Sequence, residues 1–376
     1  MKILLLFTSA ALLFGCSSST EETTRNAPEP YVQGMDTTAR PQSDFYQYAN
    51  GGWLKSTAIP AHQPSWSVFD ELQEKTEREC LSLLLDASQS QAYPEGSDLR
   101  KAIRFYRRAM DSLLAERRGL SPLQSTLSKI ALIKTKADVQ QYLMEAHSTG
   151  NNVFFEICVR PDLVDNRTHG VFITAIEPWL PDKDFYLSFD AKAKEIRARY
   201  ELHISTMLQL AATPEVQAKK EAAAIVAYET SLAKFFPTPE ERNDPTNWNN
   251  PRSISDLNRL MPSIQWEDFF KGLSLTADTV NVDEPLFARE WERSFSSFSI
   301  ETIKSYLRWS VLRNAAPYLH HAMVRESFEF NQKYLRGVER LTPRWQRAFR
   351  ETNQHFGDAI AKLYIRKSGN AETMAA

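Results

Sequence analysis

Glycine is scarce in this sequence, with 12 in 376 residues. Phosphate-binding loops need glycines at fixed spacings, and neither the Walker-type pattern nor the dinucleotide-binding pattern occurs. The sequence therefore offers no nucleotide-binding loop of either kind.

Cysteine is rarer still, and neither sign of charge predominates. After Cys16 only Cys80 and Cys158 remain; they could pair in an oxidising compartment, but two isolated thiols do not make a disulfide framework. Lysine plus arginine number 45 against 47 for aspartate plus glutamate, a formal net charge of -2. Because the chain has no excess of basic residues, a nucleic-acid partner is not expected.

The amino-terminal segment has the order of an export signal. Lys2 precedes an apolar run that is broken only by Thr8 and Ser9 and ends in Gly15-Cys16. The run is too short to span a bilayer as a mature helix, and a cysteine directly after a small residue resembles a bacterial lipobox. We expect cleavage before Cys16 and a lipid on its sulfur, so that the exported chain is anchored to a bacterial membrane. An ordinary signal peptide with a chance cysteine is the alternative.

Composition divides the chain into four segments. The lipoprotein signal covers residues 1–16, and residues 17–42, rich in serine, threonine, glutamate and proline, predict a flexible tether because they cannot bury enough apolar surface to fold. A body over 43–367 has the apolar and aromatic content of a packed domain, and residues 368–376 read as a truncated tail.

Most of the body is patterned at helical period. Ser67 and Asp70 resemble a capping box, and the stripe that follows them, Phe69, Leu72, Thr76, Cys80, Leu83 and Leu84, predicts one apolar helix face. The predicted helices are 67–85, 99–118, 137–148, 188–212, 214–237, 254–260, 300–318, 323–335 and 343–365. One β-hairpin is predicted, from two β-rich runs at 152–158 and 170–176 with turn residues between them. The expected fold is mainly α, one large multi-helix domain with a small β-hairpin insertion.

The stretch DFYQYANGGWLKSTAIPAHQPSWSVFDEL, residues 44–72, resembles the opening signature of the neprilysin and endothelin-converting-enzyme family of zinc metalloendopeptidases. Further segments agree in order: LPDKDFYL, RNDPTNWNNPRSISDL, YLRWSVLRNAAPYL, and PRWQRAF with LYIRK after it. The likeness spans about 44–366 and implies the helical N-terminal domain of that family, here in a bacterial lipoprotein form.

Within the opening stretch, Asn-Gly-Gly is interpreted as a turn. Its aromatic residues, Phe45, Tyr46, Tyr48 and Trp53, are expected to be core residues, because large aromatics fill cores far more often than they line ligand sites.

The family's chemistry needs a His-Glu-x-x-His helix, in which two histidines bind zinc and the glutamate acts as general base. None of the 7 histidines is followed by glutamate. His320 and His321 are adjacent on a predicted helix and point about 100° apart, which is poor geometry for one ion. We therefore expect no catalytic residue, metal ligand or cofactor in this chain, with zinc only in the family's catalytic domain, and no peptidase activity from the chain alone.

The resemblance also places two substrate-lining candidates. Neprilysin-like members carry an arginine just before the Phe-Asp helix opening that helps hold the carboxylate end of a bound peptide, and Ser65 stands at that position here. Asp70 matches the acidic residue that follows, although helix capping explains it equally well.

Two functions remain open at this point. The first is the substrate-enclosing N-terminal domain of a neprilysin-like peptidase, with peptide substrates when joined to a catalytic half and a membrane contact through the lipid on Cys16. The second is a non-catalytic surface lipoprotein that binds peptides or a protein partner. An unrelated enzyme that uses paired carboxylates is not favoured, because the acidic pairs at 182/184 and 240/241 are typical of solvated turns.

Overall fold

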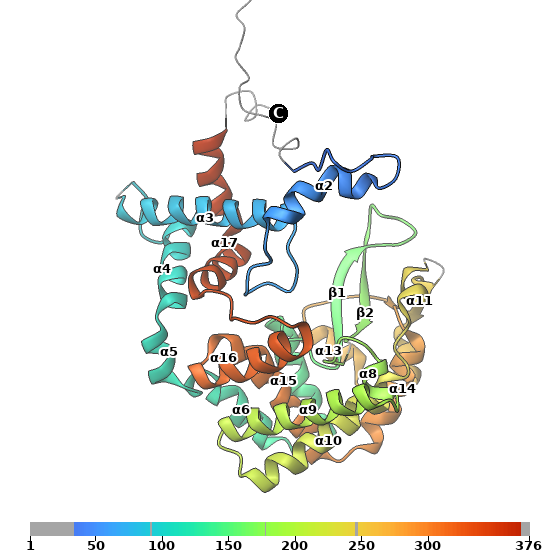
Figure 1. Ribbon diagram of the computed structural model, residues 1–376. Coiled ribbons are helices and arrows are strands. Elements are labelled where there is room, and N and C mark those ends of the chain that lie inside the picture. Colours follow the sequence, from blue (N-terminus) through green and yellow to red (C-terminus); the bar gives the residue numbers. More distant parts are fainter. Residues whose placement is uncertain (1–33, 91, 177, 245–246, 370–376) are drawn as a thin grey trace, which may run out of the picture. The chain divides into compact units, whose positions relative to one another are not determined.

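The computed structural model describes residues 34–90, 92–176, 178–244 and 247–369, so Cys16 lies outside the described residues. The chain divides into two compact units, with the boundary between Pro60 and Ala61. The described residues are mainly helical and include a small sheet, which confirms the predicted fold class (Figure 1). No helix in the described ranges is both long and apolar enough to cross a membrane.

In the first unit, the predicted Asn-Gly-Gly turn is wrong, because these residues lie inside helix α2 (Phe45–Ser56). The preceding loop folds back along this helix. A side chain at Gly51 would bring its Cβ within 2.7 Å of the Asp36 Cβ, and one at Gly52 within 2.6 Å of the Met35 carbonyl oxygen. The two glycines therefore allow close packing of the loop on the helix, which is a second use of glycine besides turns.

The aromatic residues of α2 are less buried than expected. Tyr48 and Trp53 are half-buried, but Phe45 and Tyr46 are about two-thirds exposed, at 68% and 66%. The core interpretation is wrong for Phe45 and Tyr46, whereas the backbone hydrogen bonds of the preceding loop reach α2 at Tyr48 and Trp53.

The second unit contains the remaining helices. They are α3 (Val68–Gln89), α4 (Asp98–Met110), α5 (Ser112–Arg118), η1 (Ser121–Leu123), α6 (Gln124–Leu132), α7 (Lys136–Ser148), α8 (Asp184–Leu187), α9 (Ala191–Leu210), α10 (Glu215–Ala233), α11 (Pro239–Asn243), α12 (Ile254–Leu260), α13 (Trp266–Gly272), α14 (Pro285–Ser297), α15 (Ile300–Ala315), η3 (Ala316–Tyr318), α16 (His321–Phe328), the π-helical turn η4 (Glu329–Tyr334) and α17 (Arg344–Ser368).

The long helix predicted over 99–118 is interrupted. Asp111 lies between α4 and α5, and its carboxylate accepts a hydrogen bond from the Leu114 backbone N–H at 2.8 Å. A side chain that caps the second helix competes with continuation of the first, so one periodic segment becomes two helices.

The sheet has four strands in the order β1-β2-β4-β3. β1 (Phe155–Pro161) pairs antiparallel with β2 (His169–Ala175), which confirms the predicted hairpin. β4 (Thr279–Val282) joins β2 in parallel, and β3 (Pro251–Ser253) pairs antiparallel with β4. The hairpin is therefore not alone, since two strands too short to carry a periodic signal complete the sheet.

Two apolar clusters hold the second unit together. The smaller one packs α3, α4 and α17 around Leu84, Ile103 and Phe349. The larger one fills the space among the sheet and the other helices. At its centre Phe154, with φ of 71°, packs against four rings, those of Tyr228, Trp291, Phe295 and Tyr306.

A charged pair lies inside the larger cluster. Glu229 is fully buried and accepts hydrogen bonds from the hydroxyls of Tyr186 at 2.7 Å and Tyr200 at 3.2 Å. The Arg313 guanidinium lies 3.6 Å from the Glu229 carboxylate and stacks over the ring of Trp179. Burial raises the pKa of Glu229, while Arg313 opposes that rise.

Cys80 on α3 and Cys158 on β1 are free thiols. Burial raises the pKa of each. Both side chains are therefore poor nucleophiles at neutral pH and act as small apolar residues.

Candidate functional site

The start of α3 brings together the two substrate-lining candidates. Ser65 is exposed in the loop before the helix, and Asp70 is half-buried in its first turn. Ser67 caps the helix: its hydroxyl accepts from the Asp70 backbone N–H at 3.2 Å and donates to the Asp70 carboxylate at 2.6 Å. Asp70 is thus engaged in capping and still has carboxylate capacity for a second donor.

The same turns carry an exposed apolar surface. Val68, Phe69 and Leu72 are 58%, 83% and 59% exposed, and their spacing places them on neighbouring positions of one helix face. We call Ser65, Val68, Phe69, Asp70 and Leu72 the α3 entry surface.

The predicted apolar face of this helix is not buried along its whole length, since Phe69 and Leu72 are exposed. The smaller cluster takes residues from α3 only from Cys80 onward, so α4 and α17 leave the first turns of the helix open. Single exposed leucines are common on protein surfaces, whereas several large apolar side chains exposed together make this helix start a candidate binding surface.

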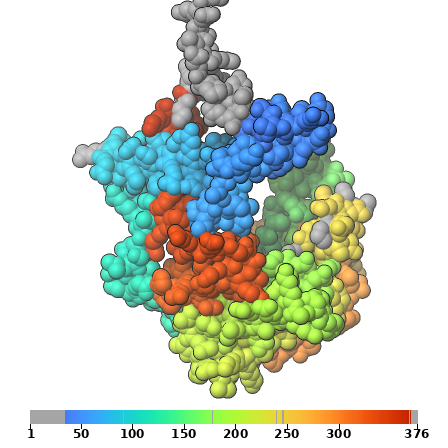
Figure 2. Space-filling model, viewed as in Figure 1, coloured from blue at the N-terminus to red at the C-terminus, as the bar shows by residue number. Residues whose placement is uncertain are grey.

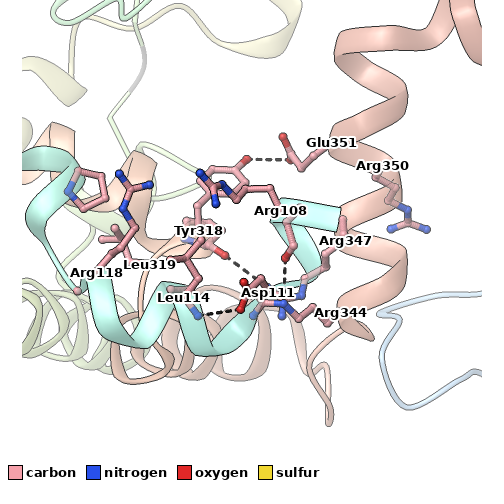
Figure 3. Close-up of a pocket in the computed structure, with 16 residues that line it drawn as sticks. Arg108, Asp111, Leu114, Arg118, Tyr318, Leu319, Arg344, Arg347, Arg350 and Glu351 are labelled. Carbon is pink, nitrogen blue, oxygen red and sulfur yellow. Dashed lines mark hydrogen bonds between the residues drawn. The ribbon is translucent and has the colours of Figure 1, made fainter. Parts of the chain in front are cut away.

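A second site is a cavity of about 300 Å³ within the second unit, here called the arginine cavity (Figure 3). It lies among the end of α4, helix α5, η1, η3 and the first turns of α17. Its charged lining residues are Arg108, Asp111, Arg118, Arg344, Arg347, Arg350 and Glu351, and its apolar wall includes Leu114, Ala115, Pro122, Pro317, Leu319 and Ala348.

Three of these arginines are held by the protein. Arg344 Nε donates to the Ala109 carbonyl at 3.0 Å, and Arg347 Nε donates to the Thr342 carbonyl at 3.1 Å. Arg350 Nε donates to the Glu77 carboxylate at 2.7 Å, and Figure 3 shows its side chain pointing away from Tyr318. The guanidinium edges of Arg344 and Arg347 that face away from these carbonyls remain as donors.

The arginine cavity has more cationic than anionic lining residues. Burial, and then the positive charge of Arg344, lower the pKa of Arg347. The Tyr318 hydroxyl donates to Glu351 at 2.8 Å, and partial burial together with this carboxylate raises the pKa of Tyr318 to about 12. Both carboxylates of the cavity are thus engaged within the protein, Asp111 as a helix cap and Glu351 by tyrosine.

A larger cavity of about 960 Å³ lies beside the sheet. At its polar end Arg160 Nη2 donates to both oxygens of Asp283 at 2.8 Å, and Thr174 donates to the same carboxylate at 2.6 Å. Burial raises the pKa of Glu284, which accepts from the Ala175 backbone N–H. Arg160, Thr174 and Asp283 thus bond one another, while Arg160 Nε is buried without a hydrogen-bond partner.

Within the described ranges, no three His, Cys, Asp or Glu side chains lie close enough together to hold a metal ion. His203 is buried and bonded to Glu326, and His147, in the last turn of α7, bonds the carbonyls of Leu143 and Phe155. The described residues do not fit a catalytic zinc ion.

The sequence predicted Ser65 and Asp70 as substrate-lining candidates but did not predict the exposure of Phe69 or the arginine cavity. The exposure of Phe69 depends on where α4 and α17 end, which periodicity does not encode. The cavity joins arginines from two segments more than two hundred positions apart, since Arg344 and Ala109 are separated by 235 residues. The one local signal was the arginine spacing 344, 347 and 350, which is helical and places three cations on adjacent turns.

Comparison with known proteins gives a consistent assignment. A family model described as Peptidase family M13 matches residues 41–376. The chain is 23% identical to endothelin-converting enzyme 1 of Mus musculus over 348 residues, covering 89% of this chain and 44% of that protein. It is 25% identical to the neutral endopeptidase of Lactobacillus helveticus, covering 89% and 52%.

Solved structures agree with the sequence relatives. The zinc metalloprotease Zmp1 of Mycobacterium tuberculosis, crystallised with an inhibitor, superimposes with a TM-score of 0.83 at 28% identity, covering 89% of this chain and 51% of that one. The chain therefore spans about half the length of the proteins it matches.

Proposed function

Because this chain belongs to peptidase family M13 and corresponds to the N-terminal part of its members, we propose that it encloses the peptide substrate of a neprilysin-like zinc endopeptidase. In this role the described residues shape the space that a peptide enters and leave the metal to a His-Glu-x-x-His region. The filter is steric: only flexible peptides of limited size would fit.

The observation that carries the proposal is the α3 entry surface. Phe69 and Leu72 offer exposed apolar area beside Asp70, and a peptide side chain that covers them gains burial of about 25 cal/mol per Å² of apolar surface. Ser65 stands where an arginine would hold a peptide carboxylate, so recognition here rests on side chains more than on the carboxyl end of the peptide.

The test is a binding measurement with a Phe69→Ser/Leu72→Ser variant. We expect its dissociation constant for a fluorescein-labelled, apolar ten-residue peptide to rise at least tenfold, which is a loss of about 1.4 kcal/mol or more. The measurement is fluorescence anisotropy on the chain without its signal segment.

The matched control is Phe189→Ser, because Phe189 is 85% exposed and Phe69 is 83% exposed. Equal weakening by the control and the double variant, or no weakening by either, would assign peptide binding to another surface. Binding of a folded protein partner with no peptide affinity would favour the non-catalytic surface lipoprotein.

We also propose that Cys16 carries a lipid that anchors the exported chain to a bacterial membrane. The support is the order of apolar run, small residue and cysteine in the leader. In a bacterial host, Cys16→Ser should move the protein from the membrane fraction to the soluble fraction and abolish its labelling by radioactive palmitate. Unchanged fractionation and labelling of the variant would count against the anchor.

A further inference from the structure

The arginine cavity lies where the two apolar clusters of the second unit meet. Its lining residue Ala348 belongs to the cluster of α3, α4 and α17, whereas Leu319 belongs to the larger cluster. Two contacts cross the junction: Tyr318 donates to Glu351 at 2.8 Å, and Arg347 Nη1 donates to the Pro317 carbonyl at 3.4 Å. Small-molecule sites favour such junctions, and about 300 Å³ is at the lower end of their usual volume.

The cavity has more cationic donors than the protein uses. Arg108 and Arg118 are exposed, and their guanidinium groups have no hydrogen-bond or ion-pair partner among the described residues. Arg344 donates through Nε to one carbonyl, and Arg347 donates through Nε and Nη1 to two carbonyls, so neither guanidinium pairs with a carboxylate. Burial, and then the like charge of Arg344 beside it, lower the pKa of Arg347.

The rest of the wall is apolar. Leu319 and Ala348 are buried, and Leu114 and Ala115 are half-buried along the same space. A ligand that satisfies this lining needs an anionic group for the guanidinium edges and a compact apolar body for the wall. Arginine edges match the planar, two-oxygen geometry of a carboxylate.

We propose that the arginine cavity binds a compact amphipathic carboxylate, such as an aromatic or short branched aliphatic acid. The carboxylate would take donors from Arg108 and Arg118, and the apolar body would lie against Leu319 of the larger cluster and Ala348 of the smaller one. By contacting both clusters, this ligand would stabilise the junction between them, independently of any peptide at the α3 entry surface.

The experiment uses the chain without its signal segment and three probes: benzoate, benzyl alcohol and inorganic phosphate. Isothermal titration should give saturable benzoate binding and a rise in melting temperature, with at least tenfold weaker binding in Arg108→Gln/Arg118→Gln. The matched control is Arg104→Gln/Arg117→Gln, which removes the same charge from the same two helices outside the cavity lining. Its benzoate affinity should equal that of the parent chain.

Each contrary result overturns the proposal. Benzoate binding that survives Arg108→Gln/Arg118→Gln places the anion elsewhere. If benzyl alcohol binds as tightly as benzoate, the cavity does not require a charged ligand. If phosphate binds as tightly as benzoate, the cavity does not require an apolar ligand. Absence of benzoate binding to the parent chain, with circular dichroism showing it folded, rejects the site.

Discussion

Replacing Arg313 by methionine should lower the free energy of unfolding of the second unit by about 3–5 kcal/mol. Arg313 lies against the buried Glu229 carboxylate, 3.6 Å from it, and methionine fills much of its volume without its charge. The variant removes the cation beside the buried Glu229 carboxylate, which keeps hydrogen bonds from two tyrosine hydroxyls and from the Trp179 backbone. The measurement is urea denaturation followed by circular dichroism.

The free energy of unfolding of Arg313→Met should decrease as the pH rises. Burial already raises the pKa of Glu229 above its ordinary value in the folded protein, and Arg313 limits that rise. Without Arg313 the folded state binds a proton more strongly than the unfolded state, so stability falls as the pH rises above the ordinary glutamate pKa. The deficit of Arg313→Met relative to the parent chain should therefore be larger at pH 8 than at pH 5.

Two further variants separate charge from packing. Glu229→Gln/Arg313→Met removes both charges and should recover most of the loss. Arg199→Met is the surface match, because Arg199 also pairs with a glutamate and stacks over a tyrosine but is mostly exposed, so its cost should stay below about 1 kcal/mol. A loss of under half a kcal/mol for Arg313→Met would mean that Glu229 is protonated in the native protein and that the pair contributes nothing.

Phe154→Ala should cost about 3–5 kcal/mol, the usual range for truncating a fully buried phenylalanine. The Phe154 ring stacks on Tyr306 at 5.3 Å between centroids and contacts Trp291 at 5.8 Å. Its removal leaves a cavity among side chains that already pack against one another, so collapse of the site is limited. Thermal unfolding should show the loss as a lower melting temperature.

The backbone at this position provides an internal check. Phe154 has φ of 71°, a conformation that favours glycine, so Phe154→Gly should be less destabilising than Phe154→Ala by about 1 kcal/mol. Phe189→Ala, at an exposed position, should change stability by less than about 0.5 kcal/mol. If alanine and glycine at 154 were equally tolerated at under 1 kcal/mol, the ring would not be a core anchor.

Periodicity predicted most of the second unit, because long helices repeat their apolar residues often enough to be recognised. Local chemistry decided the places where it failed. Asp111 ends one helix by capping the next, and Gly51 serves close packing instead of a turn. β3 and β4, at three and four residues, carry too few side chains for a pattern to develop.

The candidate sites also differ in how far the sequence predicts them. Ser65 and Asp70 could be predicted from the sequence because a continuous motif places them at the start of one helix. The exposure of Phe69 could not be predicted, since it depends on which helices stop short of it. The arginine cavity needed tertiary structure, because Arg108 and Arg344 become neighbours of one space only when α4 and α17 pack together.

The most direct test of the enclosing role is to map where a bound peptide lies. A short peptide carrying benzoylphenylalanine should, after irradiation with the chain and mass spectrometry of the digest, label residues of the α3 entry surface at Phe69 or Leu72. An excess of the unlabelled peptide should abolish that labelling. Labelling spread over unrelated surfaces, or concentrated elsewhere with residues 65–72 untouched, would contradict a substrate-enclosing function for this part of the chain.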